Sequence, residues 1–242
     1  QMDWWYVNLA HRTDRRAHAE AEVAKAGISA RRFEAYKPDD WKGDPAKVLR
    51  MRNRTPGAIG CFMSQMAVIE TVVDTDRIVV VCEDDVVFCE DIQKRLAYIA
   101  ECCPDDAAIF WLGATFHVPA VWHKKDIGRD VQCTADPRIL RTFGIWSTFS
   151  YIVNGRSARR VLDLLDAHMH ESDGIDHAAI LYLEPELNTY CFVPGCAKQY
   201  DNQSNIGNGT TFFSQFSQLG PYWFAERMED FDPEHFDWKE CR

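Results

Sequence analysis

The sequence lacks the features that mark several common classes of protein. No apolar stretch reaches the roughly 18 residues that a membrane span requires, and the N-terminus lacks the basic, apolar, small-residue order of a signal peptide. The nine cysteines show no paired Cys-x-x-Cys spacing, which argues against a zinc ribbon or a disulfide scaffold. These absences predict a reduced, cytoplasmic protein with no membrane span.

The chain also lacks an excess of positive charge. It contains 27 Lys and Arg residues against 37 Asp and Glu residues, which gives a formal net charge of −10. This balance disfavours a broad surface for a polyanion such as DNA, although the basic stretch KVLRMRNR at residues 47–54 could follow phosphates locally. The 242 residues, 46% of them hydrophobic, are enough for a full-sized core.

Two hydrophobic periodicities alternate along the chain. Continuous apolar runs predict buried strands at residues 4–9 and 77–82, and apolar residues three and four apart predict a helix at 57–73. Further strands are expected near residues 31–36, 107–113, 138–143 and 149–154, further helices at 14–26 (capped by Thr13), 90–103 and 156–168, and a polar loop from Lys37 to Pro56. Strands that alternate with helices predict an α/β fold with a mostly parallel central sheet flanked by helices.

The chain is expected to form one main domain. Residues 2–211 would contain the α/β fold, and the aromatic and acidic tail at 212–242 would pack on it or present a partner surface. No internal repeat divides the sequence further.

The second buried run ends abruptly in three consecutive carboxylates, Glu83, Asp84 and Asp85. In open α/β sheets, ligands bind beyond the C-terminal ends of the strands, which is where these residues emerge. Adjacent acids repel one another unless a cation or hydrogen-bond donors lie among them, and Mg²⁺ and Mn²⁺ prefer such oxygen ligands. The triplet therefore indicates either a metal site or a solvated strand end whose carboxylates cap a turn.

Other polar residues follow the first strand and open the central helix. Asn8, Arg12 and Arg15 lie just past the first strand, where guanidinium groups could hold a diphosphate or a ribose. The simpler alternative is a charged first helical turn. Gly57 lies in TPGAIGC, whose two glycines permit a close backbone approach, although this is neither a Walker loop nor a dinucleotide fingerprint.

Six segments in order carry a resemblance to a known family: WYVNLAHRTDRR, GAIGCFMSQ, VVVCEDDVVF, IFWLG, SYIVNGRSARRVLDLL and SNIG. Together they resemble the motifs of family 25 glycosyltransferases, which include bacterial lipooligosaccharide galactosyltransferases and collagen galactosyltransferases. The resemblance runs from about Trp4 to Gly207. It implies a GT-A-like (Rossmann-like) nucleotide-sugar-binding fold, a UDP-sugar donor and Mn²⁺ (or Mg²⁺) as the cofactor.

The resemblance also implies roles for individual residues. Asp85, with Asp84, would bind the metal, and Glu83 or Asp84 would orient the ribose or a metal-bound water. The residues expected to contact the nucleotide sugar are Asn8, Arg12, Arg15, Gly57, Ser64, Glu83, Asp84, Ser204 and Asn205. The sequence departs from the family at Ser64-Gln65, where the family commonly has Ser-His, so the role of that histidine is not carried over to Gln65.

The family is regarded as inverting, which requires a general base and no covalent intermediate. The family pattern matches Asp176, with Asp173 as the second candidate. Asp176 could instead be the N-cap of the helix that follows it. The alternatives remain open at this point.

The expected function is transfer of a hexose, galactose or glucose, from a UDP-sugar to an acceptor hydroxyl, with a saccharide such as lipopolysaccharide core as the acceptor. One alternative changes the acceptor to a hydroxylated protein side chain or a hydroxymethylated DNA base, which the acidic balance disfavours. Another is a non-catalytic nucleotide-sugar-binding scaffold, which the intact acidic triplet disfavours. Specificity lies in loops around a site, so the fold does not choose the acceptor.

Overall fold

The computed structural model describes residues 2–40, 45–51, 54–113, 131–144, 148–172, 174–200 and 224–232. Its strands are β1 (Met2–Asn8), β2 (Ala30–Glu34), β3 (Ile78–Glu83), β4 (Val86–Phe88), β5 (Ile109–Trp111), β6 (Val131–Cys133), β7 (Ile139–Thr142), β8 (Ser150–Asn154), β9 (Thr189–Phe192) and β10 (Ala197–Gln199). Its helices are α1 (Thr13–Lys25), α2 (Pro45–Arg50), α3 (Pro56–Glu70), α4 (Ile92–Cys102), α5 (Gly155–His168) and α6 (Ile175–Ala178), with the 3-10 turns η1 (Pro38–Asp40) and η4 (Met228–Asp230) and the π-helical turn η2 (Ala179–Leu183).

The central sheet has eight strands in the order β2-β1-β3-β8-β5-β9-β7-β6. β1 pairs in parallel with both β2 and β3, whereas β8 runs antiparallel to its neighbours β3 and β5. β4 and β10 form a separate antiparallel pair. The predicted α/β fold is confirmed, and the sheet is parallel in the part built from the first half of the chain and mixed beyond β3.

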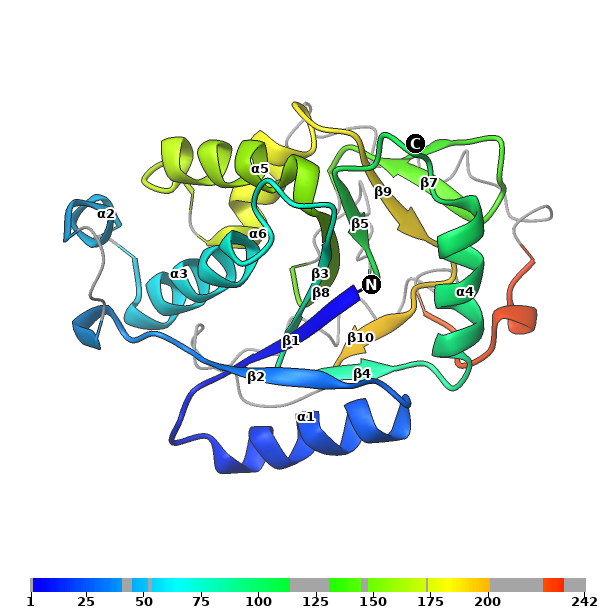
Figure 1. The fold of residues 1–242 in the computed structure, drawn as a ribbon, viewed down its shortest axis with the longest axis horizontal. Helices are drawn as coiled ribbons and strands as arrows, with labels where there is room; N and C mark the ends of the chain where they lie inside the picture. Colours follow the sequence, from blue (N-terminus) through cyan, green and yellow to red (C-terminus); the bar gives the residue numbers. More distant parts are fainter. Residues whose placement is uncertain are drawn as a thin grey trace, which may run out of the picture.

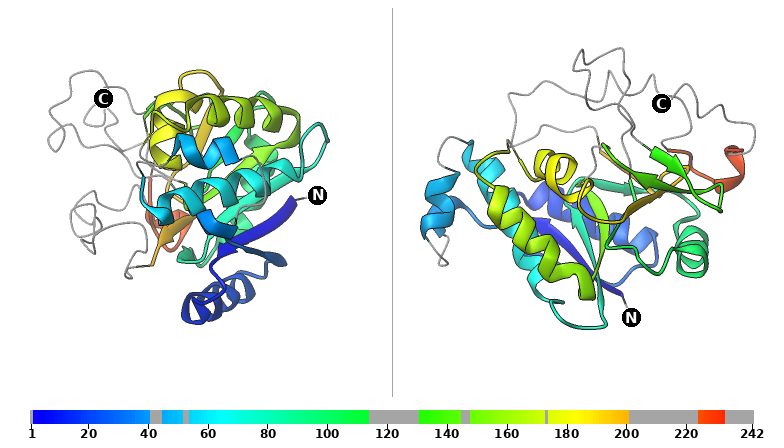
Figure 2. Two further views of the ribbon diagram at one scale, coloured as in Figure 1. Left: turned by 90° about the vertical axis from the view of Figure 1, so that its left-hand side faces the viewer. Right: turned by 90° about the horizontal axis from the view of Figure 1, so that it is seen from above.

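Helices cover both faces of this sheet (Figures 1 and 2). Along β3, Val79 and Val81 belong to the core cluster that includes residues of α3, α5 and α6, and Val80 and Cys82 belong to the cluster that includes residues of α1 and α4. Successive side chains of a strand point to opposite faces, so a strand covered on both faces must be apolar throughout. This explains why the sequence of β3 shows no polar alternation before its acidic end.

Two local predictions were wrong. Thr13 does not cap α1, because the helix begins at Thr13 and Arg12 occupies the N-cap position without a side-chain cap bond. The expected polar loop between residues 37 and 56 contains η1 and α2. α2 begins with Pro45, and proline suits the first position of a helix because its fixed φ matches and its missing N–H is not needed there.

The described part of the C-terminal tail, residues 224–232, contacts α4. The backbone N–H of Met228 donates to Asp91 Oδ2 over 2.6 Å, and Lys94 forms an ion pair with Glu229. The described cysteine side chains are all free thiols. None of the helices in the described ranges combines the length and apolar character that a membrane crossing requires.

Candidate functional site

The acidic triplet lies at the end of β3, beside the end of β1. The parallel register pairs Val7 with Glu83, so the residues that follow these two positions are neighbours. The Asn8 amide consequently donates to Asp84 Oδ2 over 2.7 Å, and both side chains are buried. The structure therefore brings together two segments that the sequence singled out separately.

Helix α1 starts directly after β1 and carries Arg15 onto the triplet. Its Nη1 donates to Asp84 Oδ1 over 2.8 Å and its Nη2 donates to Asp85 Oδ2 over 2.9 Å. The three side chains are at most 10% exposed, so solvent screens this ion triad little. One guanidinium faces two carboxylates, and the cluster carries excess negative charge even before Glu83 is counted.

The two aspartates differ in what remains unbonded. Both carboxylate oxygens of Asp84 accept hydrogen bonds, from Asn8 and from Arg15. Asp85 Oδ1 is buried and has no partner among the described residues, and the same is true of Arg15 Nε. An unpaired buried carboxylate oxygen is costly, so its persistence calls for an explanation such as an ion or a ligand group.

Glu83 is the most accessible acid of the triplet, since it is partly exposed whereas Asp84 and Asp85 are each 6% exposed. Desolvation raises its pKa well above the ordinary value, and the charges of Asp85, Asp84 and Asp176 raise it further. Burial also raises the pKa of Asp85, although Arg15 opposes the rise. The site therefore favours a bound proton or a bound cation.

The partners of Glu83 are neutral side chains. Oε1 accepts from Gln65 Nε2 over 3.0 Å and from the Cys61 thiol over 3.6 Å, and Oε2 accepts from Gln199 Nε2 over 3.5 Å. Gln199 lies equally close to Asp85 Oδ2, at 3.5 Å, and so bridges the two acids. No three His, Cys, Asp or Glu side chains within the described ranges are arranged to hold a metal ion by themselves.

Sequence reasoning did not find Cys61, Tyr151 or Gln199, and it gave no role to Gln65. Gln65 is fully buried on α3, and its Oε1 accepts from the Tyr151 hydroxyl over 2.7 Å. One signal in the sequence was available, because Cys61 and Gln65 are four residues apart and share a helix face with otherwise apolar neighbours. The strand residue Tyr151 offered no such signal.

Asp176, the candidate general base, lies in the first turn of α6. The N-cap of that helix is Gly174, so the N-cap alternative for Asp176 is wrong; its Oδ1 instead accepts from the backbone N–H of His177 over 2.9 Å. Its charge raises the pKa of both Glu83 and Cys61, which brings it electrostatically into the acidic cluster. The other predicted residues Asp173, Ser204 and Asn205 lie outside the described residues.

Two further residues predicted to contact the donor, Arg12 and Ser64, have partners within the protein. Arg12 donates from Nε and Nη2 to the Asp14 carboxylate, at 2.9 and 2.8 Å, and this pairing lowers the pKa of Asp14. The buried Ser64 hydroxyl accepts from the backbone N–H of Tyr36 over 2.8 Å. Gly57 is partly exposed in the first turn of α3.

The second glycine of TPGAIGC has a structural explanation. A Cβ at Gly60 would collide with the backbone carbonyl oxygen of Tyr36. Gly60 and Ser64 therefore permit α3 to dock closely on the chain that follows β2, and the close backbone approach expected from the sequence is made to the protein itself. The contacts of Ser64 and Gly57 with a ligand remain predictions.

The basic stretch at residues 47–54 is tied to the protein where it is described. Arg50 Nη2 lies 3.4 Å from Asp166 Oδ1 at the end of α5, and Arg54 Nε donates to the backbone oxygen of Ser172 over 2.5 Å. These contacts hold the segment against α5 and the turn that follows it. They give both arginines a role in packing.

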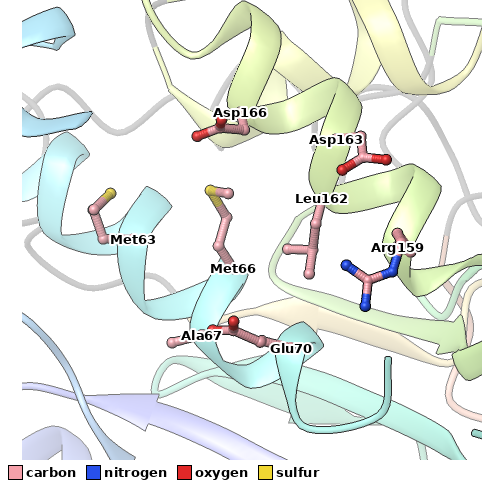
Figure 3. A pocket seen from close by; sticks show the side chains of 8 residues that line it. All are labelled: Met63, Met66, Ala67, Glu70, Arg159, Leu162, Asp163 and Asp166. Carbon is pink, nitrogen blue, oxygen red and sulfur yellow. The ribbon is translucent and has the colours of Figure 1, made fainter. Parts of the chain in front are cut away.

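A pocket of about 180 Å³ lies between α3 and α5 (Figure 3). Its lining residues are Met63, Met66, Ala67, Glu70, Arg159, Leu162, Asp163 and Asp166. None of them belongs to the acidic cluster. The candidate site is therefore the cluster at the ends of β1 and β3.

A sequence model of glycosyltransferase family 25, described as an LPS biosynthesis protein, matches residues 2–175. That range covers most of the chain, including β1, α3 and the acidic triplet. Among curated proteins, none matches the sequence significantly.

Three solved structures resemble this chain at low sequence identity. A glycosyltransferase involved in the glycosylation of the major capsid of PBCV-1 is 11% identical, with a TM-score of 0.42 over 80% of this chain and 81% of that chain. A putative glucose-1-phosphate thymidylyltransferase from Bacillus anthracis, in complex with sucrose, is 12% identical, with a TM-score of 0.44 over 79% and 87%. Mouse xyloside xylosyltransferase 1, in its apo form, is 11% identical, with a TM-score of 0.41 over 74% and 80%.

Proposed function

The chain belongs to glycosyltransferase family 25 and has a GT-A-like α/β fold, and on that premise we propose that it transfers a hexose, galactose or glucose, from a UDP-sugar to a hydroxyl of a saccharide acceptor such as lipopolysaccharide core. The observation that carries the proposal is the buried Oδ1 of Asp85 at the end of β3, which has no partner within the ranges that the structure describes. It lies in a carboxylate cluster that one arginine only partly neutralises.

The residues present fit a divalent cation that is completed by its substrate. Asp85 offers one open oxygen, and the described residues supply no set of three ligands, so most of the coordination shell would come from phosphate oxygens and water. When bound, the ion would act as a Lewis acid that stabilises the charge on the departing diphosphate. Asp85 is thus the proposed metal ligand, and both oxygens of Asp84 hold Asn8 and Arg15 in place.

Glu83 and Asp176 have separate proposed roles. Glu83 is partly exposed and is the acid proposed to orient the donor ribose. Asp176 is the proposed general base, which takes the proton from the acceptor hydroxyl as it attacks the anomeric carbon from the face opposite the diphosphate. Its charge raises the pKa of Glu83, which supports this role because the attacking hydroxyl must lie beside the bound donor.

A thermal-shift panel of nucleotide sugars, each with and without Mn²⁺, tests the proposal. We expect a metal-dependent rise in Tm with a UDP-hexose, because a ligand at 100 times its Kd adds about 2.7 kcal/mol to stability. The responding sugar then selects the donor for acceptor screens. If no nucleotide sugar raises the Tm under either condition, the proposal is wrong.

Asp176→Asn tests the assignment of the base. The amide retains the shape of the side chain and cannot accept the proton, so we expect UDP affinity to be retained and transfer to fall about 100-fold or more. Isothermal titration and a transfer assay measure the two quantities. A lower Tm with turnover retained would instead give Asp176 a structural role.

A further inference from the structure

Gln65 connects the acidic cluster to the core of the sheet. Its side chain is fully buried, and both ends of its amide are bonded: Nε2 donates to Glu83 Oε1 over 3.0 Å, and Oε1 accepts from the Tyr151 hydroxyl over 2.7 Å. Tyr151 is itself 2% exposed, and its ring packs against Trp111 with centroids 5.3 Å apart. The line Tyr151–Gln65–Glu83 thus runs from β8 through α3 to the end of β3.

The chemistry of these groups determines the orientation of the amide. When Glu83 is ionised, as it would be beside a bound cation, its carboxylate only accepts hydrogen bonds, so the NH₂ group of Gln65 faces it, as the bond from Nε2 to Oε1 shows. The carbonyl oxygen then faces Tyr151, whose hydroxyl donates to it. Burial raises the pKa of Tyr151 well above its ordinary value, so this hydroxyl keeps its proton at neutral pH.

Gln65 makes the shortest hydrogen bond to Glu83 among the described side chains. The bonds from Gln199 and Cys61 are longer, at 3.5 and 3.6 Å, and the guanidinium of Arg15 bonds the two aspartates instead. A partly exposed glutamate has several rotatable bonds, so a single rigid donor decides where its second oxygen points. The Gln65 amide has that rigidity because Tyr151 holds its other end.

We infer that Gln65 is a positioning residue for donor binding: held by Tyr151, it fixes the Glu83 carboxylate so that Oε2 is presented to the ribose of the UDP-sugar. The inference rests on the proposed function, and it adds a second layer of residues to the site. Gln65 acts through Glu83 and does not itself touch the substrate.

A double-mutant cycle tests whether Gln65 acts through Glu83. Isothermal titration of UDP with Mn²⁺ is carried out on the wild type, Gln65→Met, Glu83→Ala and the double variant. Loss of a hydrogen bond to a charged group corresponds to about a tenfold loss of affinity or more, so we expect each single variant to bind UDP about tenfold more weakly. We expect the double variant to bind no more weakly than Glu83→Ala alone, because Gln65 has nothing to position once Glu83 is gone.

Tyr151→Phe tests the same line with less disturbance of the core. It removes the hydroxyl and keeps the ring that packs against Trp111, so the fold is retained if Gln65→Met proves too destabilising. We expect a loss of UDP affinity of about threefold, because the Gln65 amide keeps its bond to Glu83 but loses its anchor. This loss should also vanish in the Glu83→Ala background.

Thr189→Val is the matched control. It removes another fully buried hydroxyl, which is 2.7 Å from Thr142 Oγ1 and far from the acidic cluster in the sheet order, and should leave UDP affinity unchanged. Losses that add in the double variant, or equal losses in Thr189→Val, would overturn the inference while leaving the proposed function intact. A wild-type protein that binds no nucleotide would overturn the proposed function and the inference together.

Discussion

Two buried arginines, Arg95 and Arg15, show how differently this protein treats the charges it buries. Arg95, on α4, is fully buried and bonds through Nε to Asp91 Oδ1 over 2.6 Å. Its Nη1 donates to the backbone oxygens of Pro194 and Gly195, and its Nη2 donates to that of Ala225, all within 2.9 Å. The charge is balanced by one carboxylate, and every nitrogen has an acceptor.

Arg15, on α1, lies in a cluster that is neither balanced nor complete. It faces two carboxylates, with Glu83 beside them, and its Nε has no partner among the described residues. Asp85 also keeps an unbonded buried oxygen. Both arginines organise distant segments, but only the Arg15 cluster leaves an unmet demand for positive charge.

The comparison indicates how a ligand site can be distinguished from a structural ion pair in one molecule. A fully satisfied buried charge stabilises packing and gains nothing from a ligand. A cluster with excess charge and an open oxygen costs stability in the free protein, and a ligand can recover that cost. Four changes test this distinction.

Loss of Arg95, whose hydrogen bonds are all satisfied, should have the largest effect on stability. Arg95→Leu would remove the counter-charge of Asp91 and the donors to three backbone carbonyls, so we expect the free energy of unfolding to fall by about 3–5 kcal/mol in urea denaturation. The neighbouring Lys94→Leu removes an ion pair whose side chains are about half exposed and should cost at most about 1 kcal/mol. Equal effects of the two variants would contradict the structural role of Arg95.

Loss of the Asp85 carboxylate should weaken ligand binding and leave folding intact. Asp85→Ala is expected to weaken Mn²⁺-dependent UDP binding by about 100-fold or more, measured by calorimetry, because hard cations depend on carboxylate ligands. The Tm should not fall, since the change also removes a repulsive carboxylate and an unpaired atom. Asp76→Ala, at an exposed ion pair with Arg156, should leave binding unchanged. Unchanged metal-dependent affinity in Asp85→Ala would contradict the proposed site.

Loss of Arg15, the cation of the acidic cluster, should change the free energy of unfolding by an amount that depends on bound metal. Arg15→Met leaves Asp84 and Asp85 without their counter-charge, so we expect a loss of about 1–3 kcal/mol in the free energy of unfolding without metal. Saturating Mn²⁺ with UDP should reduce this loss, whereas the loss in Arg95→Leu should not respond. A metal-independent loss in Arg15→Met would place the two arginines in the same class.

The change in stability per pH unit should be the smallest of the four effects. The pKa values of Glu83 and Asp85 are raised in the folded protein, so the folded state binds protons more tightly than the unfolded state. Stability is therefore greatest below the unfolded pKa near 4 and falls as pH rises toward the folded pKa, by at most about 1.4 kcal/mol per pH unit for each group.

Glu83→Gln should flatten this decline above about pH 5 in denaturant titrations, because the amide does not ionise. Exposed carboxylates with lowered pKa values, such as Glu20 and Glu171, have the opposite effect. Their contribution to the stability of the protein is lost as pH falls, so it does not affect the decline at higher pH. An identical decline in wild type and variant would contradict the raised pKa of Glu83.

Much of the fold was predictable from the chain because burial leaves a periodic record. The continuous apolar runs of β1 and β3 reflect side chains that alternate between two covered faces, and the helical spacing in α3 reflects side chains that pack into one core cluster. The acidic triplet was recognisable because three consecutive charges cannot all be buried in a strand interior, so they mark the end of the buried run. The sequence could not indicate α2, whose six residues lie in a polar stretch with too short a periodic signal.

The α/β class, the buried strands and the position of the acids at a strand end follow from the sequence, because these depend on neighbours a few residues apart. Which charges meet depends on how distant segments pack together. Arg15 lies 69 residues from Asp84, and Tyr151 lies 86 residues from Gln65. Such pairs form because strand register and helix docking bring separate segments together. No local pattern in a sequence records that Arg15 and Asn8 bond both oxygens of Asp84, while Oδ1 of Asp85 has no partner in the described part of the chain.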